Sequence, residues 1–159
     1  NRMAVETLKN KVCHDALRHK DRRNEVSIFT ECERTGLVIK ARPDLYIPSK
    51  GAVYDVKTTQ DASPSGFASE CWKYSYDIQA AYYLYVCRMA GIDVNHFKFI
   101  AVEKSAPYAS HMHVVSAGLL QSATEKMHKT LAIIKAATDK QDFGTGWGEY
   151  SILELPKWR

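Results

Sequence analysis

The chain has 159 residues, a mass of 18.0 kDa and a formal net charge of +4, with 45% hydrophobic and 25% charged residues. This is the composition of an ordinary globular domain, which excludes disordered, collagen-like and coiled-coil chains, and no apolar run is long enough to cross a membrane. We therefore expect a single domain over residues 1–159. Asn1 stands where an initiating methionine would, as it would in a piece of a longer chain.

Residues 3–19 place apolar side chains at helical spacing and predict an amphipathic helix. The first 23 residues carry seven basic and three acidic side chains. This excess of positive charge is typical either of a solvated helix face or of a surface that contacts phosphate groups.

The strands and the later helices follow in a regular order. Alternating β-rich segments at residues 25–31 and 37–42 flank a turn and predict a hairpin, and shorter strands are expected at 45–47 and 52–58. A long helix is predicted over residues 67–89, then strands over 96–103 and 111–115, and a helix from an N-cap at Ser116 to about residue 138. Strands joined by tight turns pair antiparallel, whereas a strand that follows a helix usually lies parallel to its partner. The predicted fold class is therefore α/β, with a mixed β-sheet flanked by helices.

The cysteine and histidine patterns do not favour a zinc site. The four cysteines are widely spaced, without the close pair that zinc ribbons and iron–sulfur clusters use, so we expect free thiols. His111 and His113 share one face of a predicted strand, but no third ligand follows at a suitable spacing.

Asp44, Asp55 and Lys57 are the strongest candidates for a chemical role. Asp55 and Lys57 are two positions apart on a predicted strand and therefore project from one face. Asp44 begins the preceding strand, so a meander brings it close to Asp55. Neighbouring carboxylates repel unless a cation neutralises them, and their oxygens suit Mg²⁺ or Mn²⁺. Beside such a metal, Lys57 can orient or deprotonate a water molecule.

Glu25, Gln79 and Tyr83 extend this set. Glu25 begins the first predicted strand and can reach the same place, while Gln79 and Tyr83 lie one turn apart on one face of the long helix. A D-x-K tripeptide by itself is most often a surface ion pair. The additional polar side chains are what favours a site.

These motifs resemble those of the PD-(D/E)xK nuclease superfamily. The matching segments are Pro43-Asp44, Asp55-Val56-Lys57 and Gln79-Ala80-Ala81-Tyr82-Tyr83. They are most similar to the branch of lambda exonuclease and the RecB nuclease, and within it to the exonuclease domain of exonuclease VIII (RecE). The resemblance covers residues 24–90, with aspartate at position 55 where many members have glutamate. It implies a restriction-endonuclease-like core.

The resemblance also implies roles for individual residues. The metal would be Mg²⁺, with Mn²⁺ as a substitute, and its ligands would be Glu25, Asp44, Asp55 and the backbone carbonyl of Val56. Lys57 would assist the attacking water, while Gln79 and Tyr83 would position the scissile phosphate, the metal shell or the nucleophile.

Further side chains are expected to contact DNA around this site. Trp72 and Tyr76 are the two aromatic residues of the long helix that we expect to be exposed and able to stack on bases, whereas core packing accounts for most of the others. Ser63 and Ser65 follow the catalytic strand, and Arg42 precedes the Pro43-Asp44 motif, so all three can reach a phosphate.

The function implied by the resemblance is metal-dependent 5′→3′ exonuclease activity on linear double-stranded DNA, leaving 3′ single strands for recombination. It further implies a bacterial or phage-encoded cytoplasmic protein, a homo-oligomeric ring around DNA and a single-strand annealing protein as partner. Two alternatives remain open, a structure-specific or repair endonuclease on the same core and a catalytically silent DNA-binding module. Nicking of closed circular DNA distinguishes the first, and metal titration tests the second.

Overall fold

The protein is described by a computed structural model that covers residues 2–144, 150 and 152. Its helices are α1 (Arg2–Lys9), α2 (Lys11–Leu17), the 3₁₀ helix η1 (Pro48–Lys50), α3 (Pro64–Tyr74), α4 (Tyr76–Met89) and α5 (Ala117–Lys140). Its strands are β1 (Arg23–Asn24), β2 (Ile28–Glu31), β3 (Val38–Ala41), β4 (Leu45–Ile47), β5 (Ala52–Thr59), β6 (His96–Glu103) and β7 (Ser110–Val114).

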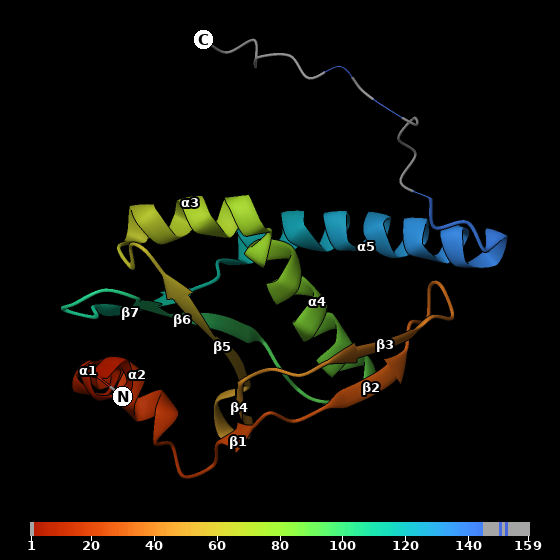
Figure 1. The fold of residues 1–159 in the computed structure, drawn as a ribbon. Coiled ribbons are helices and arrows are strands. Elements are labelled where there is room, and N and C mark those ends of the chain that lie inside the picture. The colour runs from red at the N-terminus through yellow and green to blue at the C-terminus, as the bar shows by residue number, and fades with distance from the viewer. Residues whose placement is uncertain (1, 145–149, 151, 153–159) are drawn as a thin grey trace.

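A mixed sheet in the order β1-β4-β5-β6-β7 forms the centre of the fold, with helices on both sides (Figure 1). β5 and β6 are parallel because α3 and α4 carry the chain back between them, and the other neighbours in this sheet are antiparallel. The predicted α/β class and mixed sheet are thus confirmed. The predicted β2–β3 hairpin is also confirmed, but it forms a separate two-stranded ribbon that packs on α4.

Each face of the sheet has its own apolar core. Alternation along β5 sends Val53 to the face covered by α4 and α5, and Tyr54 to the face covered by α1 and α2. Both side chains are almost completely buried. The side of a strand on which a residue lies therefore decides which layer of helices it meets.

The prediction of one continuous helix over residues 3–19 is wrong, because the structure has two helices there, α1 and α2. Asn10 interrupts it, because its side-chain oxygen accepts hydrogen bonds from the backbone N–H groups of Val12 and Cys13 and so begins α2. The same side chain donates to the carbonyl of Ser110 over 2.8 Å. This bond fastens α2 to β7.

The helix predicted over residues 67–89 is likewise divided in two. Ser75 adopts the left-handed conformation, with φ 55°, and ends α3 before α4 begins. α3 also starts earlier than expected, at Pro64, with Ser63 as its N-cap. The prediction for α5 is confirmed, since Ser116 accepts from the N–H of Leu119 at its start.

Two smaller expectations are also decided by the structure. The sequence predicts no strand before residue 25, yet Arg23 and Asn24 form β1 at the edge of the sheet. All four cysteines are free, as expected. Within the described residues, no helix has both the length and the apolar character needed to span a membrane.

Candidate active site

Three acidic residues lie at neighbouring positions along adjacent chain segments: Glu25 directly after β1, Asp44 directly before β4, and Asp55 within β5. β4 pairs with β5 so that Leu45 lies opposite Tyr54, and the next step of the same register places Asp44 beside Asp55. On the other side of Asp44, its carbonyl oxygen accepts a hydrogen bond from the backbone N–H of Glu25 over 3.2 Å. The backbone therefore sets up a row of three acidic positions across β1, β4 and β5.

Asp55 is the buried centre of this row. Its side chain is only 7% exposed and lies on the face of β5 that is covered by α4. Lys57 Nζ lies 2.7 Å from Oδ2, and Gln79 Nε2 donates to Oδ1 over 2.9 Å. Burial raises the pKa of Asp55, the neighbouring Asp44 carboxylate acts in the same direction, and Lys57 and Gln79 act against them.

The two aspartates fit a divalent metal by the chemistry of their donor atoms. Asp55 Oδ2 is buried and, within the described part of the chain, accepts no well-aligned hydrogen bond even though the Lys57 ammonium is close. Asp44 is held in place because its Oδ2 accepts a hydrogen bond from the N–H of Val56 over 2.7 Å. Carboxylate oxygens of this kind are the ligands that Mg²⁺ and Mn²⁺ prefer.

Glu25 does not complete this pair as the sequence predicts. It follows β1 in a left-handed conformation, with φ 53°, instead of beginning a strand. Its carboxylate is exposed and lies 3.1 Å from Nε of Arg42. Among the described residues no three acidic, histidine or cysteine side chains are gathered in a way that could hold a metal. The structure thus brings together Asp44 and Asp55 but turns the Glu25 side chain toward Arg42.

Aromatic rings form the wall beside Lys57. The Lys57 ammonium lies 4.6 Å from the centre of the Tyr76 ring, and this ring packs against Phe67 and Phe99. Phe99 is paired with Asp55 in the β5–β6 ladder. The Lys57 side chain is only 19% exposed, so the carboxylate and the ring together fix its ammonium near the acidic pair.

The two candidate residues of α4 have different surroundings. Gln79 contacts Asp55 directly, as described above. Tyr83 lies one turn further along α4, where its ring packs edge-on against Phe97 and near Tyr82. The structure therefore joins Gln79 to the acidic pair and gives Tyr83 contacts with the aromatic core.

The expected DNA-contacting residues are spread over several places. Arg42 lies at the acidic row, through its ion pair with Glu25. Ser63 caps α3 by accepting from the N–H of Gly66, and Ser65 is exposed in the first turn of the same helix.

The two aromatic residues named with them differ in exposure. Trp72 is 77% exposed on α3, where the Lys126 ammonium lies 5.0 Å from its ring. Tyr76, which was predicted to be exposed, is half-buried because it packs between Lys57 and Phe99. Tyr76 therefore packs beside Lys57 as part of the site's wall and is not a freely exposed ring.

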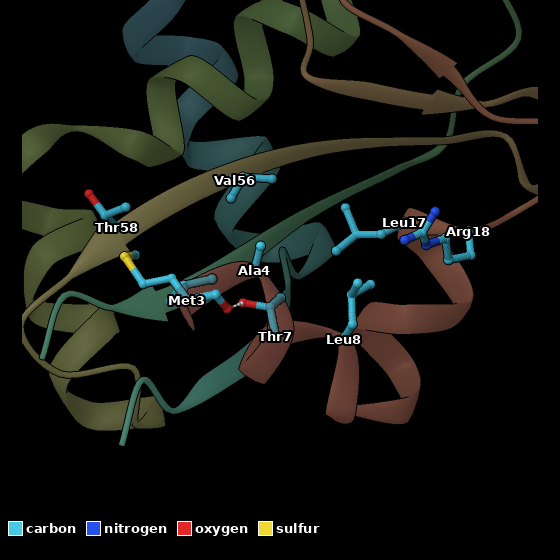
Figure 2. A pocket seen from close by; sticks show the side chains of 9 residues that line it. Met3, Ala4, Thr7, Leu8, Leu17, Arg18, Val56 and Thr58 are labelled. Atoms are coloured by element: carbon cyan, nitrogen blue, oxygen red, sulfur yellow. Dashed lines mark hydrogen bonds between the residues drawn. The ribbon is translucent and has the colours of Figure 1, made fainter. Parts of the chain in front are cut away.

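An apolar hollow of about 480 Å³ lies between α1, α2 and the sheet, on the side away from Asp55 (Figure 2). Figure 2 shows Val56 and Thr58 of β5 facing Met3, Ala4, Thr7 and Leu8 of α1, which lie below them in this view. Val56 and Thr58 alternate with Asp55 and Lys57, so the two sets face opposite sides of the strand. This hollow is therefore separated from the acidic row by the sheet.

Within the part of the chain that the structure describes, His111 and His113 gather no third metal ligand. Their rings are 4.7 Å apart, and Nε2 of His113 lies 3.2 Å from the carbonyl of Ala62 while its ring stacks on Phe67. The pKa of His113 is lowered, mainly by burial. These contacts pack the half-buried His113 against the edge of the aromatic core, while His111 is exposed.

Sequence reasoning missed the ion pair that holds α4 against α5. Asp77 is buried in the first turn of α4, and Lys126 of α5 lies 2.9 Å from its Oδ2. The helix-dipole preference for an acidic residue in a first turn could have identified Asp77. Its partner, 49 residues later, has no such local signal.

Together, the mixed sheet and the D-x-K strand with a second aspartate beside it define a protein of the PDDEXK-like class. The chain belongs to the family described as a PDDEXK-like domain of unknown function (DUF3799), which matches residues 2–153. No curated protein matches the sequence.

Two solved structures share the fold. One is a candidate exonuclease from Eubacterium rectale, with a TM-score of 0.72 and 17% identity, matched over 97% of this chain and 60% of its own. The other is a phage-related exonuclease from Haemophilus somnus 129PT, with a TM-score of 0.53 and 14% identity, matched over 89% of this chain and 74% of its own. The chain thus spans about three fifths of the length of the first.

Proposed function

We propose that the protein is a metal-dependent deoxyribonuclease whose active site contains Asp44, Asp55 and Lys57. The observation that carries this proposal is the buried Asp55 carboxylate, which lies 2.7 Å from the Lys57 ammonium and next to Asp44 in the sheet register. Burial raises the pKa of this carboxylate, and a buried carboxylate with a perturbed pKa beside a lysine and a second aspartate is typical of a chemical site.

Asp44, Asp55 and the backbone carbonyl of Val56 would hold the metal, which we propose is Mg²⁺ or, as a substitute, Mn²⁺. Glu25 would join them directly or through a water only after its carboxylate leaves Arg42. When bound, the cation would neutralise charge on the phosphate and lower the pKa of a water molecule.

Lys57 would act on the attacking water from its place beside Asp55. Its ammonium is fixed between the carboxylate and the Tyr76 ring, so little side-chain entropy is lost when it orients a water or stabilises negative charge on the phosphate. Gln79 would hold Asp55 in its binding orientation, and Tyr83 would help to position the phosphate.

The more specific proposal is a 5′→3′ exonuclease on linear double-stranded DNA, working as a homo-oligomeric ring and supplying 3′ single strands to an annealing protein. It is supported by the similarity of the D-V-K and Q-A-A-Y-Y motifs to the exonuclease VIII type, and by two solved structures of similar fold that are described as exonucleases. A ring would let several chains of modest net charge share the phosphate contacts.

Cleavage of linear and of covalently closed circular duplex DNA, each with Mg²⁺, tests this proposal. We expect the wild-type chain to degrade the linear form only, and Lys57→Ala to lose roughly a hundredfold or more of that activity. Lys104→Ala, which removes an exposed lysine from the β6–β7 loop, is the matched control and should keep full activity. Cutting of the circle would assign an endonuclease to the same site, and no metal-dependent cleavage of either form would contradict the proposal.

Gln79→Ala is expected to lower activity by roughly ten- to a hundredfold, with part of the loss recovered at higher Mg²⁺ concentration. The variant removes the hydrogen bond to Asp55 Oδ1 and leaves the carboxylate free to turn. A Mg²⁺ titration of the cleavage rate measures this effect. An unchanged dependence on Mg²⁺ would show that Gln79 does not orient a metal ligand.

A further inference from the structure

The β2–β3 ribbon has an outer face that the fold does not cover. Ile28 and Ile39 are buried on its inner face, against α4, and alternation turns Phe29 and Lys40 outward. These two residues are direct cross-strand partners. The Phe29 side chain is 63% exposed, an unusual place for a phenylalanine.

A hollow of about 350 Å³ lies on this ribbon, beside the acidic row. Its lining residues come from the two strands and the segments next to Asp44, and they are Ser27, Phe29, Lys40, Ala41 and Arg42. Arg42 joins the hollow to the row, since its Nε lies 3.1 Å from the Glu25 carboxylate. A ligand in this hollow would therefore lie next to Glu25, whose backbone N–H donates to the carbonyl of the proposed catalytic Asp44.

The chemistry of the lining is that of a site for unpaired nucleotides. Lys40 lies on β3 opposite Phe29, and Arg42 directly follows the end of this strand, two positions after Lys40. An aromatic ring next to cations binds single-stranded nucleic acid, because the ring stacks on a base while the cations contact the phosphates. A duplex offers such a ring no free base face except at an end or where strands have separated.

We propose that this hollow binds a single strand of the substrate DNA, with Phe29 stacked on an unpaired base and Lys40 and Arg42 on the adjoining phosphates. This inference rests on the proposed nuclease function. It adds a site that would hold a separated strand near the proposed catalytic residues. Charge favours DNA over a second protein surface, since Lys40 and Arg42 are basic and none of the described lining residues is acidic. A phosphate on Arg42 would take the place of the Glu25 carboxylate that now pairs with it.

Binding of a fluorescein-labelled thymidine oligonucleotide, measured by anisotropy in EDTA, tests the stacking contact without cleavage. We expect Phe29→Ala to weaken binding roughly tenfold and Phe29→Trp to restore it, because tryptophan also stacks on bases. Phe143→Ala is the matched control, since Phe143 is a comparably exposed phenylalanine beyond the end of α5. It should bind as the wild type does.

The proposed phosphate contact can be tested through the salt dependence of binding. Lys40→Gln should weaken binding and reduce the slope of log affinity against log salt by roughly 0.7, the value for one phosphate contact on a single strand. Lys104→Gln, which removes an exposed lysine elsewhere, should leave the slope unchanged.

Three outcomes would overturn the inference or separate it from the proposed function. Wild-type affinity in Phe29→Ala would overturn it, and so would a change in oligomeric state by light scattering that accompanies the loss of binding, since Phe29 would then lie in a subunit contact. If the wild-type chain binds through Phe29 but cleaves no DNA, the nuclease proposal fails and the binding site stands.

Discussion

Asp55→Asn should lower kcat/KM for metal-dependent DNA cleavage by about a thousandfold or more. We expect no loss of folding stability. The amide keeps the size of the side chain and can still hydrogen-bond to Gln79, but it removes the charge that would attract a divalent cation. It also removes the charge that holds Lys57 in place. The change therefore affects both parts of the proposed chemistry while the packing around position 55 is kept.

The stability of this variant follows from the direction of the pKa shift. Burial raises the pKa of Asp55 despite the opposing contacts from Lys57 and Gln79, so the folded protein binds the proton more tightly than the unfolded chain does. Its stabilising contribution is thus present at low pH and is lost as the pH rises through the raised pKa. Without metal, Asp55→Asn should be at least as stable as the wild type at pH 7, and its advantage should shrink on acidification.

Thermal unfolding in EDTA at neutral and acidic pH, together with cleavage assays in Mg²⁺, would measure both effects. Asp139→Asn is a suitable control, since this exposed carboxylate pairs with Lys135 on the surface of α5 and should change neither property. A clearly lower unfolding temperature for Asp55→Asn at pH 7 would show that the ion pair with Lys57 outweighs the cost of burial. Retained cleavage would remove Asp55 from the proposed metal site.

The parts of the site that could be predicted from sequence are those fixed by strand geometry. Asp55 and Lys57 share a face because side chains on a strand alternate, and Asp44 lies beside Asp55 because a tight connection makes β4 and β5 antiparallel. Gln79 was found because its motif lies on the helix that covers this face. Local periodicity and short connections were sufficient for these placements.

The remaining features depend on single residues whose conformation the pattern does not reveal. Ser75 divides the predicted long helix by adopting a left-handed conformation that few non-glycine residues take. Glu25 does the same after β1, and its side chain consequently meets Arg42 instead of the aspartates. Tyr76 could not be placed from sequence because its burial depends on Phe67 and Phe99, which come from other elements.

Phe99→Ala is expected to lower the free energy of unfolding by about 3–5 kcal/mol, a large part of the 5–15 kcal/mol typical of a domain. Phe99 is 1% exposed on β6, and its ring centre lies 4.9 Å from that of Phe97 and 5.6 Å from that of Phe67. Because these neighbours are anchored in β6 and α3, they can fill the vacated space only in part. The unfolding temperature should fall by on the order of 10 °C.

The same cavity would open beneath the proposed active site, since Phe99 is paired with Asp55 and supports the Tyr76 ring that contacts Lys57. At a temperature where Phe99→Ala is still folded, cleavage should therefore fall as well, whereas Val114→Ala on the exposed side of β7 should alter neither property. Urea unfolding curves and cleavage rates on the same samples would show both effects. A loss of less than about 1 kcal/mol would mean that the aromatic cluster repacks around the smaller side chain, and the Tyr76–Lys57 contact would then not depend on Phe99.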